Sequence, residues 1–193
     1  MRIIGGKWRS RKLGRPACTE TRPMPDRVKQ SLFDMLGHYL DCPGAIPALR
    51  VADVFAGSGS MGLEALSRGA DHCCFFERHR AVLEVLRQNI STLASQDSAL
   101  VVTGDAWRLA SQTVDDRFFD LIFLDPPYRD SADSTPDGLV RQYLRRVADA
   151  GSGRSLVVLH HDGKVRFDLT PDDPWRIVDE RRIGSNRVTV FSL

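Results

Sequence analysis

The sequence is poor in cysteine and lacks any long hydrophobic run, and these absences exclude several classes of protein. Its four cysteines form no C-x-x-C pair, so the sequence predicts neither a disulfide framework nor a zinc site. His160 and His161 have no further ligand at metal-binding spacing, and no metal is expected. No stretch approaches the roughly 18 apolar residues of a membrane span, and the basic start has no apolar core of signal-peptide length. A cytoplasmic location without membrane association is therefore expected.

Acidic residues are scarce at the start of the chain, although the whole protein has a net charge of only +2. Residues 1–29 contain nine of the 27 basic residues and two of the 25 acidic residues. This segment therefore has a net charge of +7, and the remainder has a net charge of −5. A basic segment beside a mildly acidic body favours a polyanionic partner, although a solvated tail would have the same composition. Residues 1–23 are predicted to form an extended basic arm, or a small hairpin turning at Gly5 and Gly6. Residues 24–193 are predicted to form one main domain.

From residue 50 onward, short apolar runs alternate with segments of helical periodicity, after a first predicted helix over 25–40. Strands are predicted over 51–55, 73–76, 100–102, 118–124 and 156–159, and helices over 61–68, 81–93 and 139–147. This alternation predicts a Rossmann-like, doubly wound α/β fold with a mainly parallel sheet covered on both faces. Two further runs, 175–183 and 187–193, flank a short turn and predict a closing hairpin. The hairpin would complete seven strands, one of them antiparallel.

A glycine-rich loop follows the first predicted strand. Gly57, Gly59 and Gly62 have the spacing G-x-G-x-x-G, which allows the backbone to turn tightly and a ligand to approach it closely. Asp53 begins this motif on the strand itself. The same spacing is typical of dinucleotide-binding loops, and a glycine turn without a ligand is a further alternative.

Two acids follow the next two predicted strands. Glu77 ends the second strand, where a carboxylate can accept both hydroxyls of a ribose, in NAD and in S-adenosylmethionine alike. Gly104-Asp105-Ala106 follows the third strand, where an acid or a backbone amide can bind the amino edge of adenine. Each feature alone is also an ordinary strand end or turn. Together with the glycine loop, they predict a cofactor that contains a nucleoside.

The sequence Asp125-Pro126-Pro127-Tyr128 distinguishes between these cofactors. Two prolines fix the backbone and lack N–H donors, so their carbonyl oxygens remain as rigid acceptors. The acid adds an acceptor and the tyrosine a flat face for stacking, which suits a planar ring that bears an amino group. Acceptors on the amino hydrogens favour a pyramidal, nucleophilic nitrogen and stabilise its developing positive charge. The motif therefore predicts methylation of a base amine, with Asp125 also available to remove a proton.

Four segments of the chain resemble one bacterial enzyme family. They are residues 2–13, 21–36, 55–70 and 119–128, which contain the basic start, the first helix, the glycine loop and the Asp-Pro-Pro-Tyr sequence. Over these segments the chain is similar to the 16S ribosomal RNA guanine-N2 methyltransferase D family of class I methyltransferases. Met24 departs from the threonine that the family often has there, and the chain beyond about residue 130 is only loosely similar.

The resemblance implies transfer of a methyl group from S-adenosylmethionine to the N2 atom of one guanine in 16S ribosomal RNA, within an assembling 30S particle. The target base is expected to be flipped out of its stack. The residues expected to bind it and act in catalysis are Asp125, Pro126, Pro127 and Tyr128. The expected cofactor-binding residues are Asp53, Phe55, Gly57, Gly59, Glu77, Arg78, Gly104, Asp105, Ala106 and Arg27. The expected RNA-binding residues are Lys7, Trp8, Arg9, Arg11, Lys12, Arg15 and Arg22.

Several alternatives stay open, although the single domain predicts a monomer. Trp8 would either stack on a base or pack against the body, and Arg27 would either bind the methionine carboxylate or lie on the helix surface. An adenine-N6 or other amino methyltransferase acting on DNA shares the Asp-Pro-Pro-Tyr chemistry, but usually needs a target-recognition domain for which 193 residues leave little room. An NAD-dependent oxidoreductase would explain the glycines and Glu77 but not the proline motif. A non-catalytic RNA-binding assembly factor would not need an intact cofactor loop.

Overall fold

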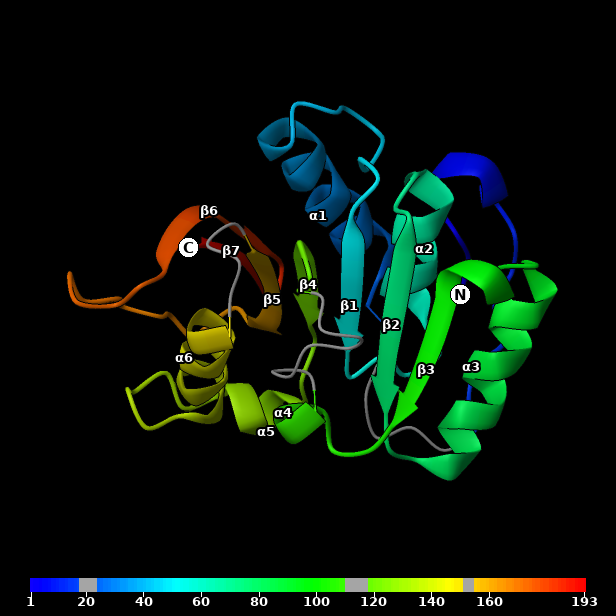
Figure 1. Cartoon of the computed structure of the whole chain (residues 1–193). Helices are drawn as coiled ribbons and strands as arrows, with labels where there is room; N and C mark the ends of the chain where they lie inside the picture. Colours follow the sequence, from blue (N-terminus) through cyan, green and yellow to red (C-terminus); the bar gives the residue numbers. More distant parts are fainter. Residues whose placement is uncertain (18–23, 110–117, 151–154) are drawn as a thin grey trace.

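The computed structural model describes residues 1–17, 24–109, 118–150 and 155–193. These residues form a seven-stranded sheet in the order β3-β2-β1-β4-β5-β7-β6, flanked by helices (Figure 1). The strands are β1 (Arg50–Val54), β2 (His72–Glu77), β3 (Ala99–Thr103), β4 (Leu121–Leu124), β5 (Leu156–Asp162), β6 (Arg176–Ile183) and β7 (Asn186–Ser192). The helices are η1 (Gly6–Trp8), α1 (Asp26–Tyr39), α2 (Ser60–Arg68), α3 (Arg80–Thr92), η2 (Gln96–Ser98), α4 (Ala106–Leu109), α5 (Tyr128–Ser131) and α6 (Leu139–Ala150).

The strand directions confirm the predicted fold class. β1 pairs in parallel with β2 and β4, and the parallel pairing extends to β3 on one side and β5 on the other. β7 runs antiparallel to both β5 and β6, because the short turn between β6 and β7 leaves no room for a crossover helix. Six strands therefore share one direction, and the closing hairpin supplies the antiparallel strand.

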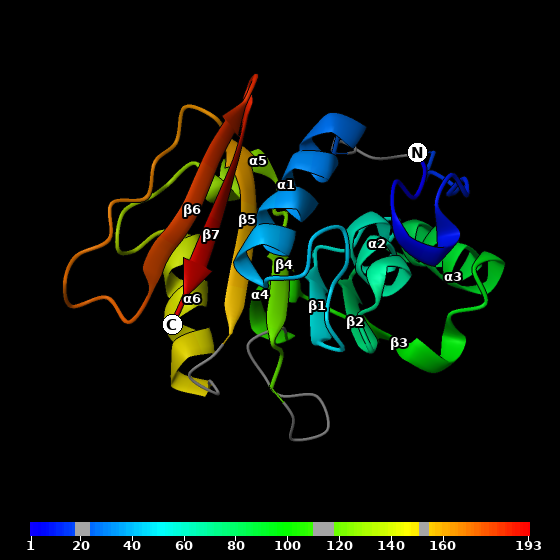
Figure 2. The ribbon, with the colours of Figure 1, turned by 90° about the horizontal axis from the view of Figure 1, so that it is seen from above.

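Helices lie on both faces of the sheet (Figure 2), and each face carries its own hydrophobic core. On one face, apolar side chains of α1, α2 and α3 pack on strand residues such as Val51 and Phe75. On the other face, α6 packs on the intervening strand residues, among them Val54 and Phe76. Successive side chains of a strand point to opposite faces, so a continuous apolar run such as Leu121–Leu124 contributes to both cores. Within the described ranges, no helix combines the length and the apolar character needed to cross a membrane.

The basic N-terminal arm is not confirmed as an extended segment, because residues 1–14 fold back onto the body. Arg2 and Lys12 pair across a single antiparallel bridge, and η1 forms the turn between them. Ile3 and Leu13 are buried in the core beside α1, α2 and α3. We call residues 1–14 the N-terminal hairpin. Ile3 and Leu13 lie ten positions apart in a basic segment and show no periodicity, so the sequence pattern predicts the hairpin only as one alternative and not its docking.

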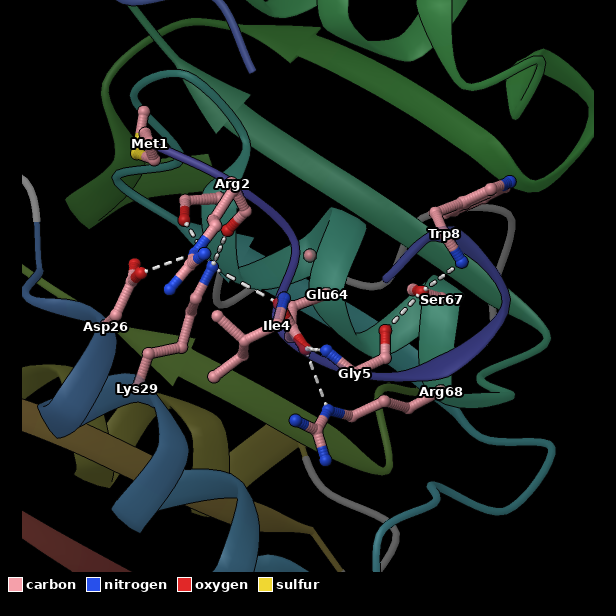
Figure 3. Close-up of polar contacts among 12 residues, drawn as sticks. Met1, Arg2, Ile4, Gly5, Trp8, Asp26, Lys29, Glu64, Ser67 and Arg68 are labelled. Atoms are coloured by element: carbon pink, nitrogen blue, oxygen red, sulfur yellow. Dashed lines mark hydrogen bonds and ion pairs between the residues drawn. The ribbon is translucent and has the colours of Figure 1, made fainter. Parts of the chain in front are cut away.

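Glu64 of α2 attaches the N-terminal hairpin to the body (Figure 3). Its buried carboxylate accepts hydrogen bonds from the backbone amides of Ile4 at 2.8 Å and Gly5 at 2.7 Å. Lys29 and Arg68, which are also buried, form ion pairs with the same carboxylate at 3.2 Å and 2.9 Å. The two amides and two cations together satisfy a charge whose burial would otherwise be strongly unfavourable.

Candidate active site

Three loops meet at the carboxyl ends of β1, β2 and β4. β1 lies between β2 and β4, which is where the strand order changes direction. In sheets of this kind, ligands bind outside the carboxyl ends of the strands at such a switch point. Backbone hydrogen bonds connect the loops: the Ala56 amide donates to Phe76 at 3.0 Å, and the Asp125 amide donates to Val54 at 3.4 Å. The structure therefore brings the glycine loop, Glu77 and the Asp-Pro-Pro-Tyr motif to one site.

Three residues of the glycine loop between β1 and α2 have positive φ angles, namely Phe55, Gly57 and Gly59. Gly57 and Gly59 have φ angles of +57° and +81°, a region that favours glycine. A Cβ atom at Gly59 would lie 2.5 Å from the side chain of Leu86, so this glycine serves internal packing. A Cβ atom at Gly57 would meet nothing closer than 3.9 Å. The loop is thus open at Gly57, where a ligand can approach the backbone.

Asp53 and Gly62 support the loop from within the protein. The buried Asp53 side chain accepts a hydrogen bond from the Gly62 amide at 2.8 Å. A Cβ atom at Gly62 would lie 2.4 Å from the Phe75 ring, so glycine allows α2 to pack closely on the sheet. Burial raises the pKa of Asp53 to about 8, and the negative charges of Asp125 and Glu77 add to this rise. The hydrogen bond from Gly62 acts in the opposite direction but is weaker than burial. A direct contact of Asp53 with a cofactor stays a prediction.

Replacing Asp53 with asparagine is expected to remove a pH dependence of stability. The pKa of Asp53 is about 8 in the folded protein, against an ordinary value of 3.8. Between these two pH values the folded state holds a proton that the unfolded state releases, so the free energy of unfolding falls as pH rises. Asparagine keeps an acceptor for Gly62 and has no such proton. Urea unfolding across this range should show the wild type losing up to about 1.4 kcal/mol per pH unit relative to Asp53→Asn. Parallel pH profiles of the two proteins would contradict the raised pKa.

Glu77 ends β2 with a carboxylate that backbone amides hold in place. One oxygen accepts the Gly57 amide at 3.0 Å, and the other accepts the amides of Arg78 and His79 at 2.8 Å and 2.9 Å. These bonds fix the carboxylate against the open side of the glycine loop. A carboxylate has about four acceptor positions, so Glu77 retains the capacity to bind a hydroxyl group.

Phe55 and Trp107 form an aromatic wall beside the loop that follows β3. Their ring centroids lie 4.8 Å apart. Asp105 accepts the Trp107 amide at 3.1 Å, while the Gly104 amide donates to the backbone of Glu77 at 3.1 Å. The loop after β3 is therefore fastened to the site, with the buried Ala106 starting α4. Trp107 is not among the residues predicted from the sequence, although an aromatic residue two positions after Asp105 was an available signal.

Asp125 and Tyr128 are connected through two residues outside their own motif. The Asp125 Oδ1 atom lies 2.8 Å from Nδ1 of His160, and Nε2 of His160 lies 2.9 Å from the side-chain oxygen of Asn186. The Tyr128 hydroxyl donates to the same Asn186 oxygen at 2.8 Å. From the sequence, His160 is considered as a metal ligand and found without partners at the required spacing, and Asn186 falls in the predicted turn before 187–193. The structure instead places both in the candidate site.

The predicted RNA-binding side chains lie mostly on the outer surface of the N-terminal hairpin. The exposed basic residues there include Lys7, Arg9, Arg11 and Lys12, and Arg15 follows the hairpin directly. Trp8 instead packs against the core, and the Lys7 ammonium lies 4.3 Å from its ring centroid. Arg22 lies outside the described residues. Arg27 on α1 and Arg78 after β2 are exposed, and their contacts with a cofactor stay predictions.

The fold and the site together define a class of protein. A doubly wound sheet with one antiparallel strand carries a glycine loop after β1, an acid after β2 and Asp-Pro-Pro-Tyr after β4. This is the arrangement of the class I methyltransferases, to which the structural neighbours also point. The chain belongs, more narrowly, to the family whose model is described as Conserved hypothetical protein 95, which matches residues 1–192.

Known proteins of similar sequence and structure agree with this assignment. The chain is 38% identical over 185 residues to ribosomal RNA small subunit methyltransferase D of Escherichia coli (strain K12), covering 95% of this chain and 85% of that protein. The solved structure of yhhF from Escherichia coli is 31% identical and has a TM-score of 0.79, covering 100% of this chain and 97% of that chain. SMU.776, solved in complex with SAH, shares the fold alone, with a TM-score of 0.61 at 12% identity over 86% of this chain and 48% of that chain.

Proposed function

We propose that the protein transfers a methyl group from S-adenosylmethionine to the exocyclic N2 atom of a guanine in 16S ribosomal RNA. The observation that carries this proposal is the position of the Asp125–Tyr128 motif beside the open glycine loop, at the switch point of the sheet. The relative named ribosomal RNA small subunit methyltransferase D supports the substrate class. We further propose that the protein acts as a cytoplasmic monomer, on the assembling 30S particle.

The site fits S-adenosylmethionine, which when bound supplies an electrophilic methyl group carried on a sulfonium. The open backbone at Gly57 accommodates a ligand without a clash, and Glu77 would accept the ribose hydroxyls beside it. Asp105 would bind the adenine edge next to the rings of Phe55 and Trp107, which offer flat apolar faces. The SAH bound to SMU.776, which has the same fold, is consistent with this cofactor.

Asp125 and the first proline supply acceptors for an amino group. Asp125 uses one carboxylate oxygen within the protein, and the second has no hydrogen-bond donor among the described residues. The Pro127 carbonyl accepts the Asp130 amide at 2.8 Å, so the Pro126 carbonyl is the backbone acceptor that remains. These two acceptors would orient the amine and stabilise the positive charge that develops on its nitrogen. The half-exposed ring of Tyr128 would stack on the flipped base.

The exposed basic residues of the N-terminal hairpin are proposed to hold ribosomal RNA by its phosphates. Deleting the segment would not test this role cleanly, because Ile3 and Leu13 belong to the core and Glu64 would lose its amide donors. Neutralising surface charges leaves these buried contacts in place. A cluster of substitutions on exposed side chains is therefore the appropriate change.

The triple variant Arg9→Gln, Lys12→Gln, Arg15→Gln is expected to bind 30S particles more weakly and with less dependence on salt. Three lost phosphate contacts would lower the slope of log affinity against log salt concentration by up to about three. A matched variant neutralises Lys164, Arg166 and Arg176, which are exposed near the opposite edge of the sheet. An equal loss of slope in the matched variant would contradict a specific role for the hairpin.

Methyl transfer to three nucleic acids in parallel tests the proposed reaction. Unmethylated 30S particles, naked 16S RNA and DNA are each incubated with the enzyme and labelled S-adenosylmethionine, and the labelled nucleosides are separated. We expect N2-methylguanosine from the particles. N6-methyladenine in DNA would instead support a DNA methyltransferase, and cofactor binding without any transfer would support a non-catalytic assembly factor.

A further inference from the structure

A buried histidine and an asparagine join the Asp125–Tyr128 motif to the closing hairpin. His160 lies on β5, beside β4, and is paired with Val188 of β7. Asn186 is the first residue of β7, directly after the turn that ends β6. The hydrogen bonds among these side chains connect residues that are 26 to 58 positions apart in the sequence. One small network thus ties together the segment after β4, the strand β5 and the start of β7.

Both ring nitrogens of His160 face hydrogen-bond acceptors. Nδ1 faces the Asp125 carboxylate, and Nε2 faces the side-chain oxygen of Asn186. The orientation of the Asn186 amide agrees with its surroundings, because its nitrogen donates to the Ile183 carbonyl at 3.4 Å. An imidazole that donates from both nitrogens carries a positive charge. Burial alone lowers the pKa of His160, but the charge of Asp125 and the two hydrogen bonds outweigh it, and the pKa is raised.

We propose that His160 and Asn186 are positioning residues for methyl transfer. His160 holds one oxygen of Asp125, and Asn186 holds both the His160 ring and the Tyr128 hydroxyl. The inference rests on the proposed function of Asp125 and Tyr128. With Oδ1 of Asp125 engaged by His160, Oδ2 is directed to the amino group of the substrate. The phenol ring is at the same time kept in a fixed orientation for stacking.

The two functional side chains need such support because packing holds neither of them fully. Tyr128 is 45% exposed and begins a helix of four residues, and the Asp125 side chain is 32% exposed. His160 is 4% exposed on a central strand, so it is a rigid anchor for both. Its ring also contacts the edge of the Tyr128 ring, with centroids 5.9 Å apart. A displacement of about 1 Å in a reacting group can cost about 10²-fold in rate.

Two substitutions of His160 separate its two hydrogen bonds. In His160→Asn, the side-chain nitrogen takes the place of Nδ1 and continues to donate to Asp125. In His160→Gln, the longer amide takes the place of Nε2 and leaves Asp125 without its donor. We expect kcat for transfer to 30S particles to fall less than about tenfold in His160→Asn and about 10²-fold in His160→Gln. The affinity for S-adenosylmethionine and the melting temperature should be the same in the two variants.

A second pair of variants tests Asn186. Asn186→Asp keeps an acceptor for His160 and Tyr128 and should keep most of the wild-type kcat, whereas Asn186→Leu removes it and should lose about tenfold or more. Equal kcat values within each pair, whether high or low, would overturn the inference. If the wild type itself transfers no methyl group, the proposed function fails instead. The two failures are therefore distinguishable.

The titration of His160 tests the network without any activity measurement. The imidazole signals of the whole protein are followed by NMR across pH in the wild type and in Asp125→Asn. Removing the carboxylate charge should move the His160 midpoint to lower pH, because that charge raises the pKa of His160. The neighbouring His161, whose pKa burial lowers to about 4, stays neutral over the same range and does not change with the variant. An identical midpoint in both proteins would overturn the proposed contact between His160 and Asp125.

Discussion

Replacement of Asp125 with alanine is expected to lower kcat for methyl transfer by about 10²–10³-fold while leaving S-adenosylmethionine affinity nearly unchanged. Asp125 follows β4 and has one carboxylate oxygen bonded to His160. Its other oxygen is the acceptor proposed for the substrate amine, whose nitrogen becomes positively charged as it attacks the methyl group. Without that acceptor, both the orientation of the amine and the stabilisation of its charge are lost.

Single-turnover kinetics and calorimetric titration of the cofactor measure the two quantities separately. Glu77→Gln provides the contrast, because Glu77 is held against the glycine loop by backbone amides and is assigned to the cofactor. Glu77→Gln should therefore lower the affinity for S-adenosylmethionine more than it lowers the single-turnover rate. If Asp125→Ala lost cofactor affinity and Glu77→Gln did not, the two assignments would be reversed.

Replacement of Glu64 with alanine is expected to destabilise the protein by about 3–5 kcal/mol, the usual cost of breaking a buried ion pair by removing one partner. The carboxylate is bonded to the amides of Ile4 and Gly5 and to the side chains of Lys29 and Arg68 (Figure 3). Its removal leaves two buried cations without this partner and releases the N-terminal hairpin from α2. The effect should therefore include increased proteolysis near the start of the chain.

Urea unfolding and limited proteolysis measure these effects. Glu84→Ala is the matched control, because Glu84 is exposed on α3 and its loss should change stability by less than about 0.5 kcal/mol. A second variant, Glu64→Ala combined with Lys29→Met, removes one of the buried charges and should recover part of the lost stability. Equal stability of Glu64→Ala and Glu84→Ala would show that the N-terminal hairpin does not depend on Glu64.

The parallel sheet could be predicted from the sequence because its strands are short apolar runs of the kind that both faces of a covered sheet require. The closing hairpin could be predicted because the turn between β6 and β7 is too short for a crossover. The docking of the N-terminal hairpin could not be predicted in this way. It depends on Glu64, about 60 residues away in the sequence, and on two apolar residues without periodicity. A charged residue inside the apolar run of α2 was the available signal.

Part of the candidate site could likewise be predicted from the sequence, and part of it could not. The glycine loop, Glu77 and the Asp-Pro-Pro-Tyr motif are contiguous or follow predicted strands, so their convergence follows from the topology of a parallel sheet. His160 and Asn186 meet Asp125 and Tyr128 only through the register of β5 and β7. That register is a property of strand pairing, which residue patterns within one strand do not determine. The different roles of the two glycines could not be predicted either. Gly57 is open to a ligand, whereas Gly59 is needed for packing because Leu86 of α3 lies against it.

Counting methyl groups in 16S RNA is the most direct test of the proposed reaction. Purified 30S particles that lack the modification are incubated with S-adenosylmethionine and either the wild-type protein or Asp125→Ala, and the nucleosides of the RNA are quantified by mass spectrometry. We expect one N2-methylguanosine gained per particle with the wild type, and almost none with the variant over the same time. No gain of N2-methylguanosine with a wild-type protein that binds S-adenosylmethionine, or an equal gain with Asp125→Ala, would contradict it.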